Sequence, residues 1–198
     1  QLAGRFALPI PGRHNLRNAA AALAAVIQGY GTPVDEARRA LARFQGVRRR
    51  QDLLGTPCGV FVYDDFAHHP TAVDETLRAI RSRHSGARLL AVFEPRSATA
   101  CRAMHQQAYA RSFGAADRVI LAPLGRTRVD GDTLDLERLV ADLRACGKDA
   151  SAPPTLDAVV DEIASWVRPG DVVLLMSNGA FGGVPGRVLA AIGANVAS

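Results

Sequence analysis

The chain has 198 residues, 48% of them hydrophobic and 22% charged, which is enough for one domain and part of a second. No apolar run approaches the length of a membrane span, and nothing at the start resembles a signal peptide. The net charge of +5 comes from arginines spread among 19 acidic residues, so an anionic small molecule such as a nucleotide is a better partner than nucleic acid.

The first 45 residues predict two helices and little else. Residues 1–12 are apolar and rich in Pro and Gly, which is typical of a strand end that runs into a loop. Residues 15–28 are dense in alanine and predict a buried helix. Thr32 as N-cap and Pro33 in the first turn predict a second helix, which Gly46 ends. Two helices cannot bury a core, so we expect residues 1–45 to belong to a domain whose remainder lies upstream.

Beyond a predicted linker at residues 46–55, strands alternate with helices. The apolar runs predict strands at residues 60–63, 89–93, 119–122 and 172–176. Helical spacing predicts helices at residues 71–82, 99–113, 134–145, 155–167 and 184–192, with Thr155 as a cap. This alternation predicts that residues 56–198 form an α/β domain with a mostly parallel sheet.

Polar segments follow three of these strands, at residues 64–70, 94–99 and 177–183. Ligands of open parallel sheets gather at the carboxyl ends of strands, so we expect the three segments to line one edge. The first contains two carboxylates and two imidazoles, which are possible metal ligands: Asp64, Asp65, His68 and His69. Capping of the next helix, with Thr71 and Asp74 as a capping box, is the simpler interpretation. Asp65 is also a possible acceptor for a sugar hydroxyl.

The other polar groups leave alternatives open. Arg96 at a strand end suits either a surface ion pair or a grip on carboxylate or phosphate. The Gly-rich segment 177–183 suits either an anion-binding loop or a plain tight turn. Asn15 is placed to cap a helix, whereas Asn18, one turn later, is free to bind a ligand. The arginines at 48–50 are typical of a solvated linker, and at a hinge they could bind a nucleotide.

Two absences narrow the chemistry that this sequence can carry. The three cysteines (Cys58, Cys101 and Cys146) are widely spaced, which argues against a disulfide framework or a zinc site and fits a reducing cytosol. The sequence contains no GxxxxGK[ST] motif, so we expect any phosphate-binding loop for ATP to lie outside it.

Several segments together resemble the Mur ligases. Residues 12–18 (Gly-Arg-His-Asn-Leu-Arg-Asn) are similar to the G-x-H-N-x-x-N segment of that family. Residues 46–52 (Gly-Val-Arg-Arg-Arg-Gln-Asp) look like its interdomain linker, and residues 64–71 (Asp-Asp-Phe-Ala-His-His-Pro-Thr) look like its D-[FY]-[AG]-H-x-P turn. The matches cover the whole chain in the right order. Residues 97–99 are Ser-Ala-Thr where Ser-Asn-Thr is expected, which removes no required group.

The resemblance implies a Rossmann-like domain with helices on both faces, preceded by two helices from the end of a central ATPase domain. It implies an ATP-dependent ligase of the bacterial cytoplasm, with magnesium bound by residues upstream. The motifs at 64–71, 94–97 and 177–183 look like those of the members that join UDP-N-acetylmuramate to L-alanyl-γ-D-glutamyl-meso-diaminopimelate in peptidoglycan recycling. The alternatives are a ligase that adds L-alanine to UDP-N-acetylmuramate and a non-catalytic nucleotide-binding module.

The resemblance also implies roles for individual residues. Asn15 and Asn18 would reach the adenine, and Arg50 and Asp65 would bind the ribose or a nearby phosphate. His68 would approach the nucleotide as the candidate catalytic residue. Four residues are candidates for holding the tripeptide: Arg96, Ser177, Asn178 and Phe181.

Overall fold

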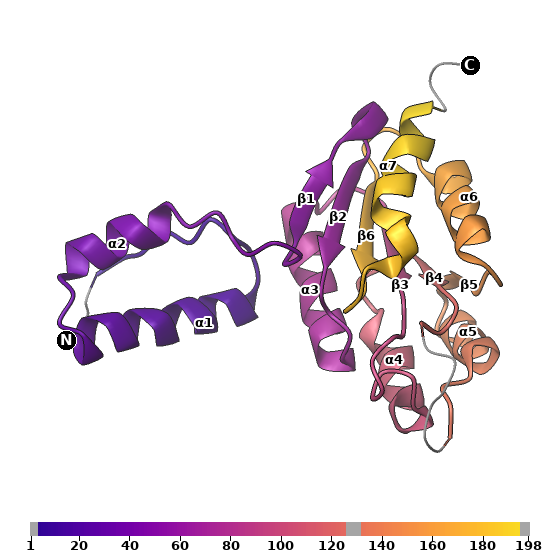
Figure 1. Ribbon diagram of the computed structural model, residues 1–198, viewed down its shortest axis with the longest axis horizontal. Helices are drawn as coiled ribbons and strands as arrows, with labels where there is room; N and C mark the ends of the chain where they lie inside the picture. Colours follow the sequence, from indigo (N-terminus) through magenta and orange to yellow (C-terminus); the bar gives the residue numbers. More distant parts are fainter. Residues whose placement is uncertain (1–3, 126–131, 195–198) are drawn as a thin grey trace.

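A six-stranded sheet with helices on both faces forms the body of the molecule (Figure 1). The computed structural model describes residues 4–125 and 132–194. The strand order is β1-β2-β6-β3-β4-β5, and every neighbouring pair is parallel except β1 and β2. The strands are β1 (Asp52–Gly55), β2 (Phe61–Asp65), β3 (Leu89–Phe93), β4 (Arg118–Leu121), β5 (Asp149–Ser151) and β6 (Val172–Met176). The predicted α/β class with a mostly parallel sheet is confirmed.

The sheet separates two apolar cores. Helices α3 (Pro70–Arg83), α4 (Gln106–Ser112) and α5 (Leu136–Ala145) cover one face, and α6 (Leu156–Trp166) and α7 (Val184–Ala194) cover the other. Along β6, Leu174 packs into the first core and Leu175 into the second, because side chains alternate across a strand. The strand must therefore be apolar throughout. Three short 3-10 turns complete this domain: η2 (Pro57–Gly59), η3 (Ala103–His105) and η4 (Phe181–Gly183).

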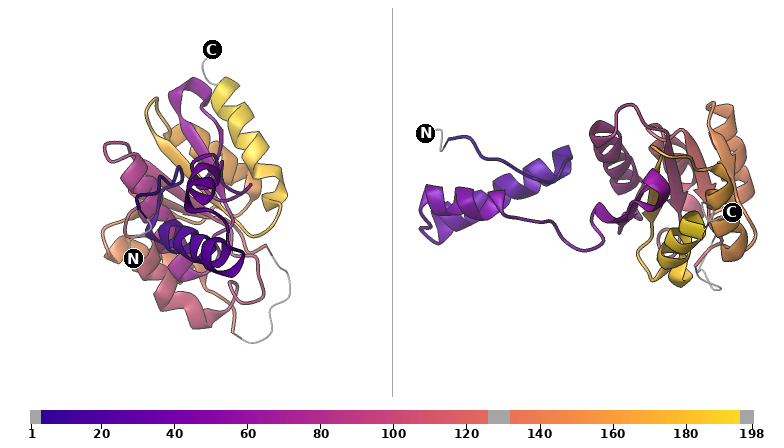
Figure 2. Two further views of the ribbon diagram at one scale, coloured as in Figure 1. Left: turned by 90° about the vertical axis from the view of Figure 1, so that its left-hand side faces the viewer. Right: turned by 90° about the horizontal axis from the view of Figure 1, so that it is seen from above.

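The N-terminal segment extends from one side of this domain (Figures 1 and 2). It contains α1 (Arg13–Ala24), a π-helical turn η1 (Ala25–Gly29) and α2 (Val34–Ala42). Both helices were predicted, but the prediction that the first is buried is wrong. No residue of α1 is buried, and Leu16 is 59% exposed, because no layer of the described chain packs over its apolar side. Residues 4–12 form no strand.

The starts of α2, of α3 and of the helix predicted at residues 99–113 differ from the sequence prediction. Thr32 does not cap α2: Pro33 has an extended ψ of 137°, so the helix begins only at Val34. The cap of α3 is His69, whose ring accepts the amide of Thr71, while Asp74 pairs with Arg78. The predicted helix at residues 99–113 is helical only from η3 onward, because its start pairs with a distant segment.

That pairing is set by three contacts between residues 101–103 and residues 132–134. Arg102 and Thr133 form an isolated antiparallel bridge. The amide of Leu134 donates to the carbonyl of Cys101 at 2.8 Å, and the amide of Ala103 donates to Asp132 at 2.9 Å. Tertiary hydrogen bonding thus overrides helix propensity in this segment.

Two edge strands were not predicted. Strand β1 lies inside the segment predicted as linker and pairs antiparallel with β2. Strand β5 has three residues and, within the described part of the chain, pairs with β4 alone. Strand β2 also runs two residues further than predicted, so Asp64 and Asp65 lie in the strand and not after it. The sheet therefore carries both carboxylates on rigid backbone.

Candidate functional site

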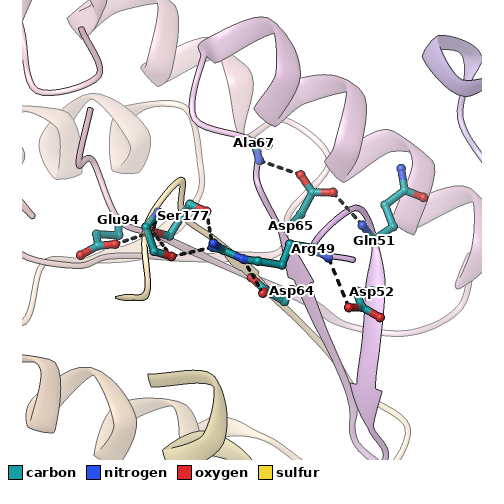
Figure 3. Close-up of polar contacts among 9 residues, drawn as sticks. Arg49, Gln51, Asp52, Asp64, Asp65, Ala67, Glu94 and Ser177 are labelled. Atoms are coloured by element: carbon teal, nitrogen blue, oxygen red, sulfur yellow. Dashed lines mark hydrogen bonds and ion pairs between the residues drawn. The ribbon is translucent and has the colours of Figure 1, made fainter. Parts of the chain in front are cut away.

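Three polar segments meet at the carboxyl ends of β2, β6 and β3, as the sequence predicts. In the parallel register, Met176 of β6 lies between Asp65 of β2 and Phe93 of β3. The next residues, Ser177 and Glu94, are therefore neighbours, and the Ser177 hydroxyl donates to the Glu94 carboxylate (Figure 3). This edge brings together groups that lie more than eighty positions apart in the sequence.

Asp65 holds Gln51, a residue of the predicted linker, on the end of β2. Its side chain is buried, and its two oxygens accept the amides of Gln51 at 2.8 Å and Ala67 at 2.7 Å (Figure 3). The Thr76 hydroxyl donates to it at 3.4 Å. Burial raises the pKa of Asp65, and the two backbone hydrogen bonds oppose this effect. The carboxylate therefore has defined partners on both oxygens: Oδ1 accepts from Ala67 and Thr76, whereas Oδ2, which accepts from Gln51, keeps a further lone pair.

A cavity of about 600 Å³ lies between the N-terminal segment and the β2 edge of the sheet. Four of the five residues predicted to bind the nucleotide line it: Asn15, Asn18, Arg50 and Asp65. Its apolar walls come from the N-terminal segment and the linker, and include Leu8, Ile10, Phe44 and Val47. His14, Gln51 and Thr76 add further polar groups. Its volume is typical of small-molecule sites, which measure roughly 300–1,000 Å³.

The chemistry of this cavity fits a nucleoside. Apolar side chains suit the faces of a flat base, and carboxamides suit its polar edge. Gln51 is only 7% exposed, and its Oε1 is buried without a hydrogen-bond partner. Its Nε2 lies 3.5 Å from Nε2 of His14. A buried carbonyl oxygen without a partner is unfavourable in the free protein, so a ligand donor at this position would relieve it.

The two predicted asparagines occupy one side of the cavity. Asn15 lies inside the first turn of α1, whose cap is Gly12, so the capping interpretation is wrong. Its side chain instead donates to the carbonyl of Pro11 at 2.6 Å. Asn18, one turn further along, is exposed at the cavity wall. Both amides therefore lie on the same helix and line the cavity that Asp65 also lines.

His68 is not brought to this cavity. Its Nδ1 lies 3.0 Å from the carbonyl of Phe66, and its ring meets the Phe66 ring edge-on at 5.5 Å. Its own carbonyl accepts the Tyr109 hydroxyl at 2.6 Å, which fixes the turn before α3 against α4. His68 thus does not line the cavity that the other four predicted nucleotide residues share.

Arg96 lies at the opposite end of the same edge. Its guanidinium is 3.7 Å from the carboxylate of Glu94, which is 3% exposed. A Cβ at Gly179 would lie 2.2 Å from Cδ of Arg96, and one at Gly125 would lie 2.8 Å from its Cγ. The Arg96 side chain therefore passes between Gly125 and Gly179. Any larger residue at either position would displace Arg96. Its head remains partly exposed, as an anion-binding group requires.

The predicted peptide-binding residues of the loop after β6 differ in their surroundings. Ser177 is fully buried and also accepts the amide of Gly179 at 3.0 Å, so it shapes the loop. Asn178 has a buried Oδ1 without a hydrogen-bond partner. Phe181 is 1% exposed and packs in the core between the sheet and α7, so its ring supports the loop from below and is not exposed for a ligand.

Sequence reasoning missed Arg49. Its guanidinium lies 3.0 Å from Asp64 and donates to the carbonyls of Ser177 at 2.7 Å and Gly179 at 2.6 Å (Figure 3). Burial raises the pKa of Asp64, and the charge of Arg49 opposes this. The run of three arginines was a signal, but nothing in it distinguishes Arg49 from Arg48 or Arg50.

In residues 4–125 and 132–194, no three His, Cys, Asp or Glu side chains come close enough to hold a metal ion. The residues weighed as ligands have other partners: Asp64 with Arg49, Asp65 with two amides and His69 with Thr71. No helix in the same ranges is long and apolar enough to cross a membrane.

Comparison with known proteins places these features in a family. The family described as Mur ligase, glutamate ligase domain, matches residues 48–179. A UDP-N-acetylmuramate–L-alanyl-γ-D-glutamyl-meso-2,6-diaminoheptandioate ligase from Haemophilus influenzae is 38% identical over 91% of this chain and 38% of its own length. A UDP-N-acetylmuramate–L-alanine ligase from Chelativorans is 37% identical over 87% of this chain and 37% of its own length.

A solved structure agrees with the sequence matches. The murein peptide ligase from Psychrobacter arcticus is 32% identical, with a TM-score of 0.71 over 95% of this chain and 38% of that one. The chain thus spans well under half the length of the relatives it matches.

Proposed function

The chain belongs to the Mur ligase family, whose members are ATP-dependent amide ligases, and we propose that it is the C-terminal part of one that joins UDP-N-acetylmuramate to L-alanyl-γ-D-glutamyl-meso-diaminopimelate. The observation that carries the proposal is the shared edge of the sheet. A cavity suited to a nucleotide lies at one end of it, and a partly exposed guanidinium lies at the other. A ligase that activates one substrate with ATP and then receives a second substrate needs both a nucleotide site and a site for the second substrate.

The domain division follows from the same reasoning. We propose that residues 1–45 are the last helices of a central ATP-binding domain, 46–55 the interdomain linker and 56–198 the C-terminal domain. The exposed apolar side chains of the N-terminal segment support this, because Leu16 is 59% and Tyr30 85% exposed. Leu23, Val26 and Leu41 line an apolar groove between α1 and α2 that the rest of such a domain would cover.

The nucleotide site would be shared between this chain and the domain upstream. Asn15 and Asn18 would bind the edge of the adenine, while Arg50 and Asp65 would bind the ribose or a phosphate. His68 would reach the nucleotide only if the C-terminal domain closed about the linker, as ligase and kinase domains do. The phosphate-binding loop and the magnesium ligands would come from the upstream domain.

We propose that the other end of the edge binds the incoming peptide. Arg96 is suited to a bidentate grip on a peptide carboxylate, and the tripeptide carries carboxylates far from its reacting amine. Ser177 would shape the loop, and the buried Oδ1 of Asn178, which has no hydrogen-bond partner in the free protein, would accept from the peptide once the loop adjusts. Phe181, buried in the core, would act only through the position of this loop.

The reaction would use ATP to phosphorylate the muramyl carboxylate, after which the peptide amine attacks to give an amide, ADP and phosphate. This chain would contribute to the reaction by positioning the peptide amine and the nucleotide. Holding the amine against the activated carboxyl converts a bimolecular step into one within the complex. Arginine side chains at the edge would neutralise the charge of the bound anions.

A second candidate is the ligase that adds L-alanine to the same nucleotide sugar, because the Chelativorans relative is nearly as similar as the Haemophilus one. The test is to incubate the full-length protein with ATP, magnesium and UDP-N-acetylmuramate, add one amine at a time, and identify products by mass. Formation of the tripeptide conjugate supports the proposal. Formation of only the alanine conjugate supports the second candidate, and no product with either favours a nucleotide-binding module.

A further inference from the structure

We propose that Arg49 is a positioning residue that fixes the peptide-binding loop at residues 177–179 relative to the nucleotide cavity. This inference rests on the proposed function for its kinetic consequence, but not for its structural one. Arg49 itself does not line the cavity, and it need not touch either substrate.

The hydrogen-bond partners of the Arg49 side chain are residues that do not line the cavity. The Nε atom lies 3.0 Å from Oδ2 of Asp64 in β2, and one terminal nitrogen donates to both loop carbonyls. The guanidinium carbon also lies 5.5 Å from the centre of the Phe66 ring. A single side chain from the linker thus joins β2 to the loop that follows β6 (Figure 3).

The backbone around Arg49 is arranged to send it in this direction. Arg49 and Gln51 both have left-handed backbone angles, with φ of 60° and 52°, which is uncommon for residues other than glycine. Such angles persist where the surroundings determine them. Here the amide of Arg49 donates to Asp52 at 3.2 Å, and its carbonyl accepts the amide of Phe66 at 2.8 Å.

The next two residues of this turn belong to the nucleotide cavity. Arg50 and Gln51, which follow directly, line the nucleotide cavity. Arg49 therefore contacts the loop after β6, while Arg50 and Gln51 line the nucleotide cavity. Because the three residues are consecutive, this one turn of backbone fixes the position of the loop relative to the cavity. Ser177 and Glu94 hold the loop from its other side.

The planar guanidinium is essential to this role. Its donors point in fixed directions and can meet a carboxylate and two carbonyls at once, whereas a lysine ammonium is a point charge on a flexible stem. Arg49→Lys should therefore keep the charge and lose the fixed loop geometry. Because small displacements of reacting groups are costly, we expect the KM for the peptide to rise about tenfold or more, with the KM for ATP changing much less.

The test uses the full-length protein, with Arg48→Lys as the matched control, since Arg48 is an exposed neighbour in the same arginine run and, unlike Arg50, does not line the nucleotide cavity. KM values for ATP and tripeptide are measured alongside amide hydrogen exchange of residues 177–180. The expected result is faster exchange and a raised peptide KM in Arg49→Lys only. Unchanged exchange and unchanged peptide KM in that variant, or equal rises in both KM values, would overturn the proposal.

Failure of the proposed function and failure of the role proposed for Arg49 give different results. If wild-type protein does not ligate the tripeptide, the proposed function fails, while the exchange data still decide the role of Arg49. If Arg49→Lys does not fold, Asp64→Asn removes the ion pair but leaves both carbonyl contacts. Exchange at residues 177–180 should then rise to a smaller extent, and an unchanged rate would contradict the proposal.

Discussion

The backbone amide of Gln51 donates a 2.8 Å hydrogen bond to the carboxylate of Asp65, and this bond attaches the predicted linker to the end of β2. A second backbone amide, from Ala67, donates to the other oxygen at 2.7 Å. Because both amides are donors, only a side chain with two acceptor oxygens can satisfy them together. An asparagine would turn its NH2 group toward one of these amides.

Asp65→Asn should therefore lower the free energy of unfolding by about 1–3 kcal/mol, the cost of leaving a buried donor unpaired. Urea denaturation of the chain measures it, with Asp74→Asn as a control, since Asp74 forms only a surface pair with Arg78. An equal effect of the two substitutions would contradict the account of Asp65.

In the full-length protein, Asp65→Ala should raise the KM for ATP much more than that for the tripeptide. The substitution removes the Asp65 carboxylate from the cavity and frees the backbone of Gln51, and we place both residues at the nucleotide. Steady-state kinetics with each substrate varied in turn gives the two values. An unchanged KM for ATP would remove Asp65 from the nucleotide site.

Gly179→Ala should weaken peptide binding without disturbing the fold. The new Cβ would lie 2.2 Å from both Cδ and Nε of Arg96, so the arginine would have to leave its slot. We expect the KM for the tripeptide to rise about tenfold, because the loop and Arg96 are displaced together.

The control is Gly86→Ala, since Gly86 has no atom within 4 Å of an added Cβ. Neither glycine has a positive φ, so neither substitution strains the backbone. If Gly179→Ala binds the peptide as well as Gly86→Ala does, Arg96 has no part in peptide binding.

Two histidines should make the fold sensitive to acid. Burial lowers the pKa of His84 below its ordinary value of 6.5, with a smaller contribution from Arg83. Burial also lowers the pKa of His105, with a smaller contribution from His69. The unfolded chain then binds more protons than the folded chain just below pH 6.5, so stability falls as the pH drops through that value.

Melting temperatures measured across this range test the effect. The decrease on acidification should become smaller in His84→Gln and in His105→Gln. A decrease of the same size in both variants would show that other groups cause it, and an increase in the wild-type protein would show that the direction is wrong.

The chain alone should have no ligase activity. We place the phosphate-binding loop and the magnesium ligands in the domain upstream, so residues 1–198 would hold only one wall of the nucleotide site. Phosphate release by the isolated chain, with all three substrates and magnesium, should not exceed the rate without protein. Turnover by the chain would contradict the proposed division of the site.

The central strands could be predicted from sequence because burial on both faces leaves an uninterrupted apolar run, as at Leu89–Phe93 and Val172–Met176. Strand β5 could not, because three residues at a sheet edge carry no such pattern. The start of the 99–113 helix was missed for a different reason. It depends on pairing with residues 132–134, which no local preference encodes.

The meeting of three polar segments at one edge followed from the parallel sheet, and most of the predicted nucleotide residues share one cavity. The role of Arg49 could not be predicted. Three identical side chains follow one another, and only the left-handed turn at residues 49 and 51 decides which one points to the loop. His68 lies outside this cavity, with its ring turned toward Phe66 and its carbonyl accepting from Tyr109, so its approach to the nucleotide stays a prediction.

The central claim is that this chain belongs to a tripeptide ligase, and competition between acceptors tests it most directly. The full-length protein is given ATP, magnesium, UDP-N-acetylmuramate and equal concentrations of tripeptide and L-alanine in one reaction. The ratio of the two products equals the ratio of kcat/KM values. The account predicts that the tripeptide conjugate predominates by at least about a hundredfold, which a site built on buried polar groups can reach. A predominance of the alanine conjugate would contradict it.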